Sequence, residues 1–312
     1  GFDESFVRVG HWVGKGDQRV YLANKLTDDT IDFITRHQDE PFAVTLAHYV
    51  VHIPLQAEAD LINHYQAKPK PSKGVNNPIY AAMVAHADRS VGRVLKTIDD
   101  LKLREKTLVV FYSDNGGLRQ IFHGDGPIVS TNDPLHDEKG TLYEGGIRVP
   151  LIVRWPGVVK PGQTSDAVVT SVDLYPTFLE ATGAQPPKDQ HLDGLSLLPV
   201  LRQSTKLKRD AIYWHYPHYH HSRPGGAIRS GDWKLIEFFD DPQAVELYNL
   251  AEDTGEANNL AAEKPQQVAA LKAKLSTWRA KVNAAMPTPN PDYDPARKAT
   301  WGHHPDRPVK KN

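Results

Sequence analysis

The spacing of apolar residues changes along the chain, and this change divides it into two parts. Up to about residue 205, apolar positions either recur every three to four residues, as in a helix, or form short unbroken runs, as in buried strands. The strands predicted from the runs lie at 42–47, 107–112 and 149–153, and the predicted helices lie at 27–36, 80–103 and 171–183. Strands that alternate with helices indicate an α/β fold with a mainly parallel sheet between helices.

Beyond residue 205 the apolar segments are shorter, and turn signals such as Gly225-Gly226 separate them. This pattern is typical of antiparallel hairpins, with strands at 211–214, 227–229, 233–239 and 246–250. An amphipathic helix is predicted at 264–285, and four prolines in the following residues indicate an extended tail. We therefore expect an α/β domain at 1–204, a C-terminal α+β subdomain at 205–286 and a proline-rich tail at 287–312.

The apolar run 107–112 ends in Ser113-Asp114-Asn115-Gly116-Gly117, which places a carboxylate beside a carboxamide where a strand stops. In open α/β sheets, ligands bind outside the carboxyl ends of the strands. Carboxylate and amide oxygens are the ligands that Ca²⁺ and Mg²⁺ prefer. Taken by itself, the motif is more typical of an Asx turn that closes a strand, and only the motifs further along the chain favour the metal site.

Three further segments carry candidate groups. Lys139 precedes a glycine-rich turn, and His52 follows the first predicted strand. Residues 213–221 alternate aromatic rings with imidazoles, a mixture that suits sugar rings and anions. The same aromatic side chains are also compatible with the core of the C-terminal subdomain, so both interpretations stay open for His215 and His218.

Composition excludes some classes of partner. Lys and Arg number 37 against 38 Asp and Glu, a formal net charge of -1, so neither nucleic acid nor an acidic membrane is an expected partner. The chain has no cysteine, which excludes disulfides and thiolate metal sites. No apolar run approaches the ~20 residues of a membrane span. Because the chain opens at Gly1 without an initiator Met, we expect that it was cut from a longer parent, and any signal peptide with it.

Six short motifs occur together in the order found in one enzyme family. They are Asp88-Arg89-Ser90-Val91-Gly92, Phe111 to Gly117, Lys139 to Pro150, Asp173-Leu174-Tyr175-Pro176-Thr177, Ile228 to Ile236 and Glu246-Leu247-Tyr248-Asn249-Leu250. Through these motifs the chain resembles the formylglycine-dependent (type I) sulfatases of the alkaline-phosphatase superfamily, from Gly1 to about Ala285. The resemblance implies an alkaline-phosphatase-like sheet between helices, followed by a smaller antiparallel subdomain.

The resemblance also implies roles for individual residues. Asp114 and Asn115 match a pair of Ca²⁺ ligands, with Mg²⁺ as the alternative ion. Lys139 matches the lysine that contacts the sulfate, and His52 matches the histidine that helps to protonate the leaving alcohol. These groups suit the reaction, because cleavage of a sulfate monoester moves negative charge onto the bridging oxygen. A sulfated carbohydrate is the expected substrate, and a periplasmic or extracellular location is expected.

Four histidines are candidates for substrate contacts. His215 and His218 belong to the aromatic segment, whereas His123 and His136 lie between the Asp-Asn pair and Lys139. The family often carries Pro-Leu-Arg-Gly-Gly before Lys-Gly, and this chain has Pro134-Leu135-His136-Asp137-Glu138 instead. Because an acidic pair stands in place of the glycines, the resemblance does not fix the local loop geometry or the substrate preference.

The nucleophile of the family is not encoded in this chain. The formylglycine of these enzymes comes from a Cys or Ser in a Cys/Ser-x-Pro-x-Arg motif, and these 312 residues contain none. The early Asp-Asp pair of metal ligands is also absent. We therefore expect a missing N-terminal segment of the same protein, and we expect the 312 residues by themselves to be inactive.

Two other functions remain open at this point. One is a phosphate or phosphonate monoester hydrolase of the same superfamily, which shares the sheet and the metal chemistry. The other is a non-catalytic relic that binds a carbohydrate or an anion. Comparing the turnover of aryl sulfate and aryl phosphate esters distinguishes a phosphatase from a sulfatase. The sequence upstream of Gly1 distinguishes a relic without a nucleophile from an enzyme that has one.

Overall fold

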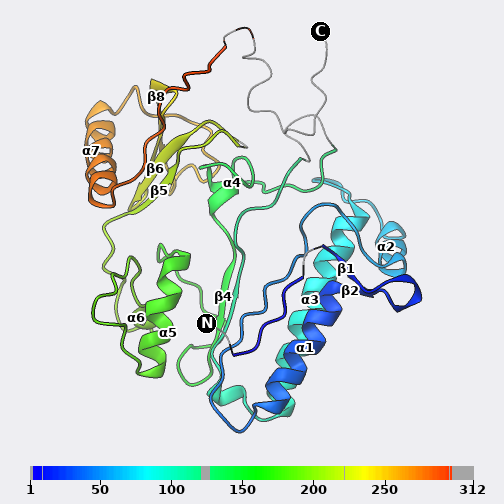
Figure 1. Cartoon of the computed structure of the whole chain (residues 1–312). Helices are drawn as coiled ribbons and strands as arrows, with labels where there is room; N and C mark the ends of the chain where they lie inside the picture. The colour runs from blue at the N-terminus through cyan, green and yellow to red at the C-terminus, as the bar shows by residue number, and fades with distance from the viewer. Residues whose placement is uncertain (1–2, 9, 121–126, 221, 295, 297–312) are drawn as a thin grey trace. The chain divides into compact units, whose positions relative to one another are not determined.

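The computed structural model describes residues 3–8, 10–120, 127–220, 222–294 and 296, and the chain forms two compact units (Figure 1). The first unit comprises residues 1–110, 126–130 and 153–161. The second comprises residues 111–125, 131–152 and 162–312. None of the helices in the described ranges is long and apolar enough to cross a membrane.

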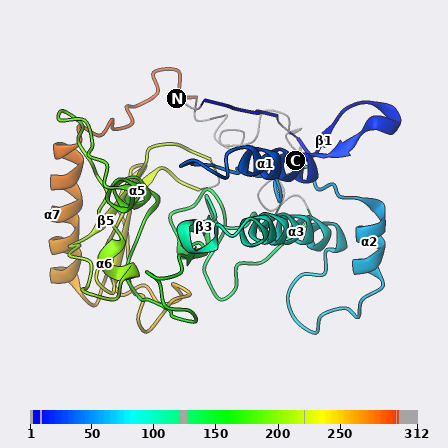
Figure 2. The ribbon, with the colours of Figure 1, turned by 90° about the horizontal axis from the view of Figure 1, so that it is seen from below.

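The first unit is built around two long helices, α1 (Leu22–Arg36) and α3 (Pro78–Asp100), which run side by side in Figures 1 and 2. Asn77 caps α3, because its Oδ1 accepts a hydrogen bond from Tyr80 N at 3.0 Å. The predicted start of α1 at Thr27 was wrong. Thr27 lies inside the helix and is buried. Its Oγ1 donates a hydrogen bond to Ala23 O at 2.6 Å, which satisfies the buried hydroxyl.

The shorter elements of this unit were less predictable. They are β1 (Trp12–Val13), the 3₁₀ turn η1 (Gly16–Gln18), β2 (Val20–Tyr21), α2 (Ala59–Gln66) and η2 (Arg104–Lys106). β1 and β2 pair antiparallel. No strand forms at 42–47, although the sequence predicts one. The segment has no hydrogen-bonded neighbour among the described strands, and Val44 is 39% exposed.

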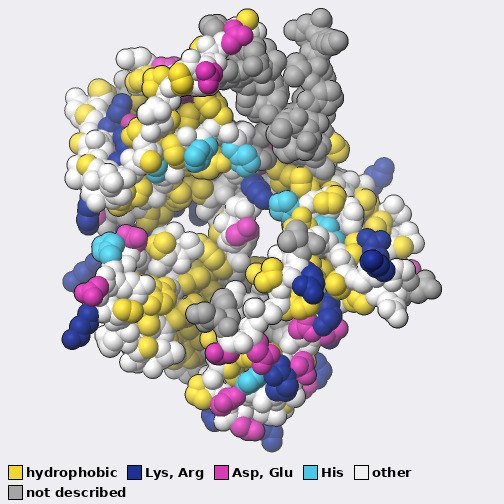
Figure 3. Space-filling view, in the orientation of Figure 1, with side chains coloured by type: hydrophobic (Ala, Val, Ile, Leu, Met, Phe, Trp, Pro, Cys, Tyr) yellow, Lys and Arg dark blue, Asp and Glu magenta, His cyan; other side chains and the backbone are white. Residues whose placement is uncertain are grey.

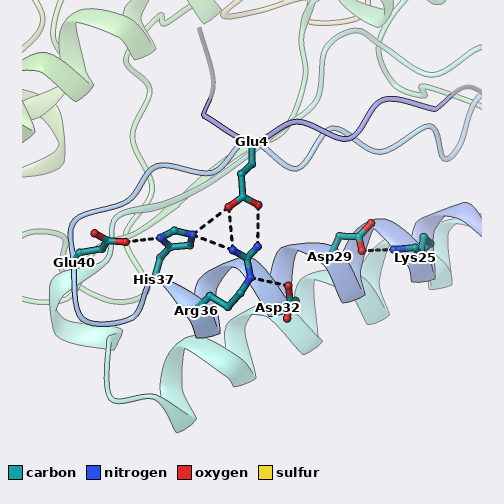
Figure 4. Close-up of polar contacts among 7 residues, drawn as sticks. All are labelled: Glu4, Lys25, Asp29, Asp32, Arg36, His37 and Glu40. Carbon is teal, nitrogen blue, oxygen red and sulfur yellow. Dashed lines mark hydrogen bonds and ion pairs between the residues drawn. The ribbon is translucent and has the colours of Figure 1, made fainter.

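The surface of α1 carries a network of charges around Arg36 (Figure 4). The Arg36 guanidinium contacts Glu4 at 2.8 Å and Asp32 at 2.9 Å, and His37 Nδ1 contacts Glu40 at 2.5 Å. The hydrogen bond from Arg36 lowers the pKa of Glu4 to about 2. Acidic and basic side chains also alternate on this surface in the space-filling view (Figure 3). Because these groups are exposed, salt screens their attraction.

The strands β3 (Val109–Tyr112) and β4 (Leu151–Arg154) pair as a two-stranded sheet. They match the predicted strands 107–112 and 149–153 to within two residues at each end. The short helix α4 (Glu144–Ile147) lies between them in sequence. The mixture of helices and strands in this part of the chain agrees with the predicted α/β class.

The second unit also contains η3 (Ser171–Asp173), α5 (Leu174–Thr182) and α6 (Leu198–Leu201). Gly183 ends α5 in the left-handed conformation, with φ 72°. Asp173 is fully buried and forms an ion pair with Arg209, while its Oδ1 accepts from Leu195 N at 2.9 Å. This carboxylate therefore fixes the loops on both sides of α5.

The C-terminal sheet is antiparallel, in the order β5 (Ile212–Tyr216), β6 (Gly225–Ser230), β7 (Trp233–Phe238) and β8 (Asp241–Asn249). Helix α7 (Pro265–Lys281) lies along this sheet in both ribbon views. The hairpins and the helix predicted at 264–285 are thus confirmed. The domain boundary predicted near residue 205 stays a prediction, because the compact units follow a different division.

The two faces of this sheet are covered by different parts of the chain. On one face, Leu235 and its neighbours pack against Leu271 and Leu275 of α7. Burial of such leucines contributes about 1.5–3 kcal/mol each. On the other face, Ile236 and its neighbours pack against Leu142, which belongs to the glycine-rich segment after Lys139. The sheet is therefore a support for that segment.

Candidate functional site

Asp114 and Asn115 follow β3 directly and form a tight turn. Asp114 Oδ1 accepts a hydrogen bond from Asn115 N at 3.0 Å, and Asn115 Nδ2 donates to Gly116 O at 3.0 Å. Both contacts reach only the next residue, whereas an Asx turn joins a side chain to the backbone two residues on, so the Asx-turn interpretation stays a prediction. The second oxygen of Asp114 and the side-chain oxygen of Asn115 accept no hydrogen bond from the residues that the structure describes. These two oxygens are free to meet a ligand.

The segment that holds Lys139 is tied to this turn by main-chain hydrogen bonds. Lys139 N donates to Gly117 O at 3.3 Å, and Gly116 N donates to Gly146 O at 2.9 Å. The two segments therefore form one layer, although Asn115 and Lys139 are 24 positions apart in the sequence. The predicted neighbourhood of the Asp-Asn pair and the lysine is present in the second unit.

Glycine is required where the two segments meet. A Cβ on Gly116 would lie 1.7 Å from Gly145 O, and a Cβ on Gly145 would lie 2.3 Å from His136 O. No real Cβ tolerates such distances, so any other residue would force the two segments apart. The glycines therefore allow the two backbones to approach each other closely.

Two residues that sequence analysis missed hold the layer together. Asn132 Oδ1 accepts from Gly117 N at 3.1 Å, and its Nδ2 donates to Gly117 O at 2.8 Å and to Asp137 O at 3.0 Å. The buried carboxylate of Glu138 accepts from the amides of Arg119 and Gln120. Neither has a sequence signal, because an Asn and a Glu in a polar loop are expected to face water.

The oxygens of Asp114 and Asn115 fit part of a calcium or magnesium site. Both are hard donors, they are adjacent, and Asp114 is exposed at the end of β3. Ca²⁺ takes about 6–8 oxygens. Within the described residues, no group of three or more His, Cys, Asp or Glu side chains could hold a metal ion. The pair therefore fits an incomplete donor set to which further oxygens would have to be added.

His52 lies in the first unit, on the loop before α2. Its Nδ1 lies 2.6 Å from Ile53 O, and because a carbonyl only accepts, Nδ1 carries the hydrogen. The ring is exposed and contacts Tyr49, with 5.1 Å between the ring centroids. His52 O accepts from the buried His11 at 2.8 Å. This arrangement leaves Nε2 as the ring nitrogen able to exchange a proton with a ligand.

The other predicted histidines differ in how their rings are used. His136 is exposed and packs on Tyr143, with ring centroids 4.2 Å apart. His215 Nε2 donates to Ala285 O at 2.8 Å, so this ring holds the chain after α7 against β5. His218 is exposed beside Tyr216. A substrate role stays a prediction for all three, and the geometry favours His218 over His215. His123 lies outside the described residues.

Comparison with protein families gives two matches along the chain. Residues 5–184 match the family model described as Sulfatase. Residues 135–281 match the model described as N-sulphoglucosamine sulphohydrolase, C-terminal. The second match covers Lys139, the glycine-rich segment, the C-terminal sheet and α7.

Individual proteins agree with the family models. A sulfatase of Formosa agariphila is 37% identical over 300 residues, which are 88% of this chain and 52% of the relative. An N-acetylglucosamine-6-O-sulfatase of Bacteroides thetaiotaomicron is 35% identical over 189 residues, covering 58% of this chain and 31% of the relative. The crystal structure of Ps i-CgsB in complex with k-i-k-neocarrahexaose superimposes with a TM-score of 0.71 and 29% identity, covering 83% of this chain and 55% of that one.

The chain spans about half the length of the first of these relatives. The Sulfatase family model by itself matches more than half of the 312 residues of this chain. The chain belongs to the sulfatase family.

Proposed function

We propose that this chain is part of a sulfuric ester hydrolase that cleaves a sulfate monoester on a sulfated carbohydrate. The observation that carries the proposal is the single layer formed by the Asp114–Gly117 turn and the Lys139 segment. This layer of the second unit carries one side-chain oxygen each of Asp114 and Asn115 that accepts no hydrogen bond from the described residues, together with the Lys139 ammonium. A cation and a lysine are what the oxygens of a sulfate ester require, since cleavage shifts negative charge onto them.

Each residue would have a separate task. Asp114 and Asn115 would hold part of a Ca²⁺ or Mg²⁺ site, and such an ion supplies Lewis-acid stabilisation of anionic oxygens. Lys139 would hold one sulfate oxygen and steady the charge that develops on the bridging oxygen. His52 would donate a proton from Nε2 to the leaving alcohol, while its Nδ1–H remains bonded to Ile53 O.

The nucleophile in this proposal is a formylglycine that belongs to a segment outside these 312 residues. The chain contains no cysteine and no Ser-x-Pro-x-Arg sequence that could be its precursor. We accordingly propose that the 312 residues have no turnover by themselves, and that the complete protein works outside the cytoplasm. The similarity to an N-acetylglucosamine-6-O-sulfatase supports a sugar sulfate as substrate.

The test is release of inorganic sulfate from sulfated oligosaccharides, measured by ion chromatography. The 312-residue chain, a longer product that includes the upstream residues, and its Lys139→Ala variant would be compared. Only the longer product with Lys139 intact is expected to release sulfate. Preferential hydrolysis of an aryl phosphate would support the phosphatase alternative, and binding of the oligosaccharide without any turnover would support the relic.

A further inference from the structure

Lys234 in the middle of β7 is a fully buried cation. Its exposed fraction is 0%, and a lysine is almost never buried in this way without a partner. Its Nζ lies 2.9 Å from Glu144 Oε1 and 2.7 Å from Glu256 Oε1, and both carboxylates are buried as well. Three ionisable groups thus meet in the interior of the second unit.

The three residues form a closed cycle. Glu256 Oε2 accepts a hydrogen bond from Glu144 N at 2.7 Å, so Glu256 holds both the main chain of Glu144 and the Lys234 ammonium that its side chain meets. The remaining oxygen of Glu144 faces Arg148 at 3.6 Å and Arg229 at 3.9 Å. Burial raises the pKa of Glu256, and the neighbouring Lys234 opposes this effect.

The position of the cycle relates it to the candidate site. Glu144 is the first residue of α4, five residues after Lys139. Two residues further along the same helix, Gly146 O accepts the hydrogen bond from Gly116 N. A four-residue helix has little stability of its own, so its place depends on what holds it. The contacts lead from β7 through Glu144 to the turn that carries Asp114.

An apolar core would stabilise this region at least as well. Replacement of a buried ion pair by packed apolar groups is commonly neutral or stabilising. An ionic contact differs from an apolar one in direction, since Nζ must lie within hydrogen-bond reach of both carboxylates. An ionic cycle therefore specifies the position of α4 in a way that leucines would not.

We propose that Lys234 is a positioning residue: through Glu144 it fixes α4, and with it the distance between Lys139 and the Asp114–Asn115 pair. The importance of that distance rests on the proposed function. The positioning itself is a property of the chain without substrate. A role confined to stability would loosen the whole unit, whereas a positioning role loosens residues 114–117 and 139–146 first.

The test is amide hydrogen exchange in the 312-residue chain with Lys234→Met. Exchange at Lys139, Gly116 and Gly145, whose amides all donate within the layer, is expected to become about tenfold faster or more. The matched control is Arg279→Met, which breaks the ion pair between α7 and Glu237 on the same strand β7. Both variants are compared at urea concentrations that give equal global stability.

Equal acceleration in the two variants, or none at these amides in Lys234→Met, would overturn the proposal. If Lys234→Met does not fold, the variant Glu144→Gln/Lys234→Met/Glu256→Gln removes all three charges of the cycle, leaves Arg148 and Arg229 partly open to solvent, and is expected to fold with the same local loosening. A triple variant that does not fold, or that keeps the amides protected, would refute positioning. Failure of the sulfate-release assay would leave the exchange result unaffected, so the two proposals are judged separately.

Discussion

Gly116 N donates to Gly146 O over 2.9 Å, and this hydrogen bond joins the turn that carries Asp114 to the segment that carries Lys139. The contact depends on the lack of a side chain at Gly116, because a Cβ there would overlap Gly145 O. A reaction that needs both segments is therefore sensitive to a methyl group added at Gly116, although Gly116 has no side chain to take part in the reaction.

The first prediction concerns that methyl group. Gly116→Ala is expected to lower the free energy of unfolding by about 1–3 kcal/mol, since the two backbones must separate to admit the Cβ. Urea unfolding followed by circular dichroism measures the change. Gly92→Ala is the control, because nothing lies within 4 Å of a Cβ at this position in α3. It is expected to stabilise by about 0.5–1 kcal/mol. Equal urea midpoints for Gly116→Ala and the native chain would contradict the overlap.

The second prediction concerns the oxygens after β3. Calcium binding can be followed by the amide resonances of residues 113–117 during a titration. Asp114→Asn is expected to raise the dissociation constant for calcium by about tenfold or more, since it removes the charged ligand. Asp189→Asn removes the same charge from an exposed loop and serves as the control. If both variants respond to calcium as the native chain does, the Asp-Asn pair is a turn and no ligand set.

The third prediction concerns the buried pair of Asp173 and Arg209. Asp173→Asn leaves the Arg209 guanidinium, 9% exposed, without its counter-charge. Loss of one partner of such a pair costs about 3–5 kcal/mol. The exposed pair of Lys274 and Asp210 is the control, and Asp210→Asn is expected to cost less than about 1 kcal/mol. Urea unfolding of both variants decides the matter, and similar losses would show that burial does not set the cost.

The fourth prediction concerns acid stability of the first unit. Burial lowers the pKa of His11, His48 and His86 below the usual 6.5. The unfolded chain then binds more protons than the folded one as the pH falls below about 6.5, so stability decreases in that direction. His37 acts oppositely, because its hydrogen bond with Glu40 raises its pKa. His37 is only half-buried and its partner Glu40 is exposed, so solvent screens this opposing effect.

The expected result is a lower urea midpoint at pH 5.5 than at pH 7.5. His86→Gln removes one of the buried imidazoles, whose side chain is 1% exposed, and is expected to reduce this pH dependence. His64→Gln on α2 is the control, since His64 is exposed, and it should leave the dependence unchanged. A His86→Gln variant with the full native pH dependence would remove His86 from the explanation.

The sequence predicted the elements whose signals are local. The helical period around Val91 and the run that ends at Tyr112 were confirmed, because both depend on spacing within one segment. The strand at 42–47 was wrong. Its apolar run resembles a strand, but a strand also needs a neighbour, and sequence spacing does not supply one.

Prediction of the site had a similar limit. Asp114 and Lys139 were found through their motifs, and their segments do adjoin. Asn132, Glu138 and Lys234 were missed, because each is polar and reads as a surface residue in its own segment. Their roles arise from partners far away in the sequence, such as Glu144 for Lys234. Buried polar contacts of this kind are a property of the fold and have no local pattern.

On β7, the neighbouring side chains of Lys234 and Leu235 point to opposite faces of the sheet, and this restricts the register in which the strand can pair. Leu235 faces the helix that follows the sheet, and Lys234 faces the two carboxylates. A slip of one residue along β6 or β8 would exchange these directions. It would drive an ammonium into the leucines of α7 and leave Glu144 and Glu256 to repel one another unpaired. A shifted register of this sheet is therefore destabilised on both faces at once, and Lys234 helps to specify the correct strand register of the C-terminal sheet.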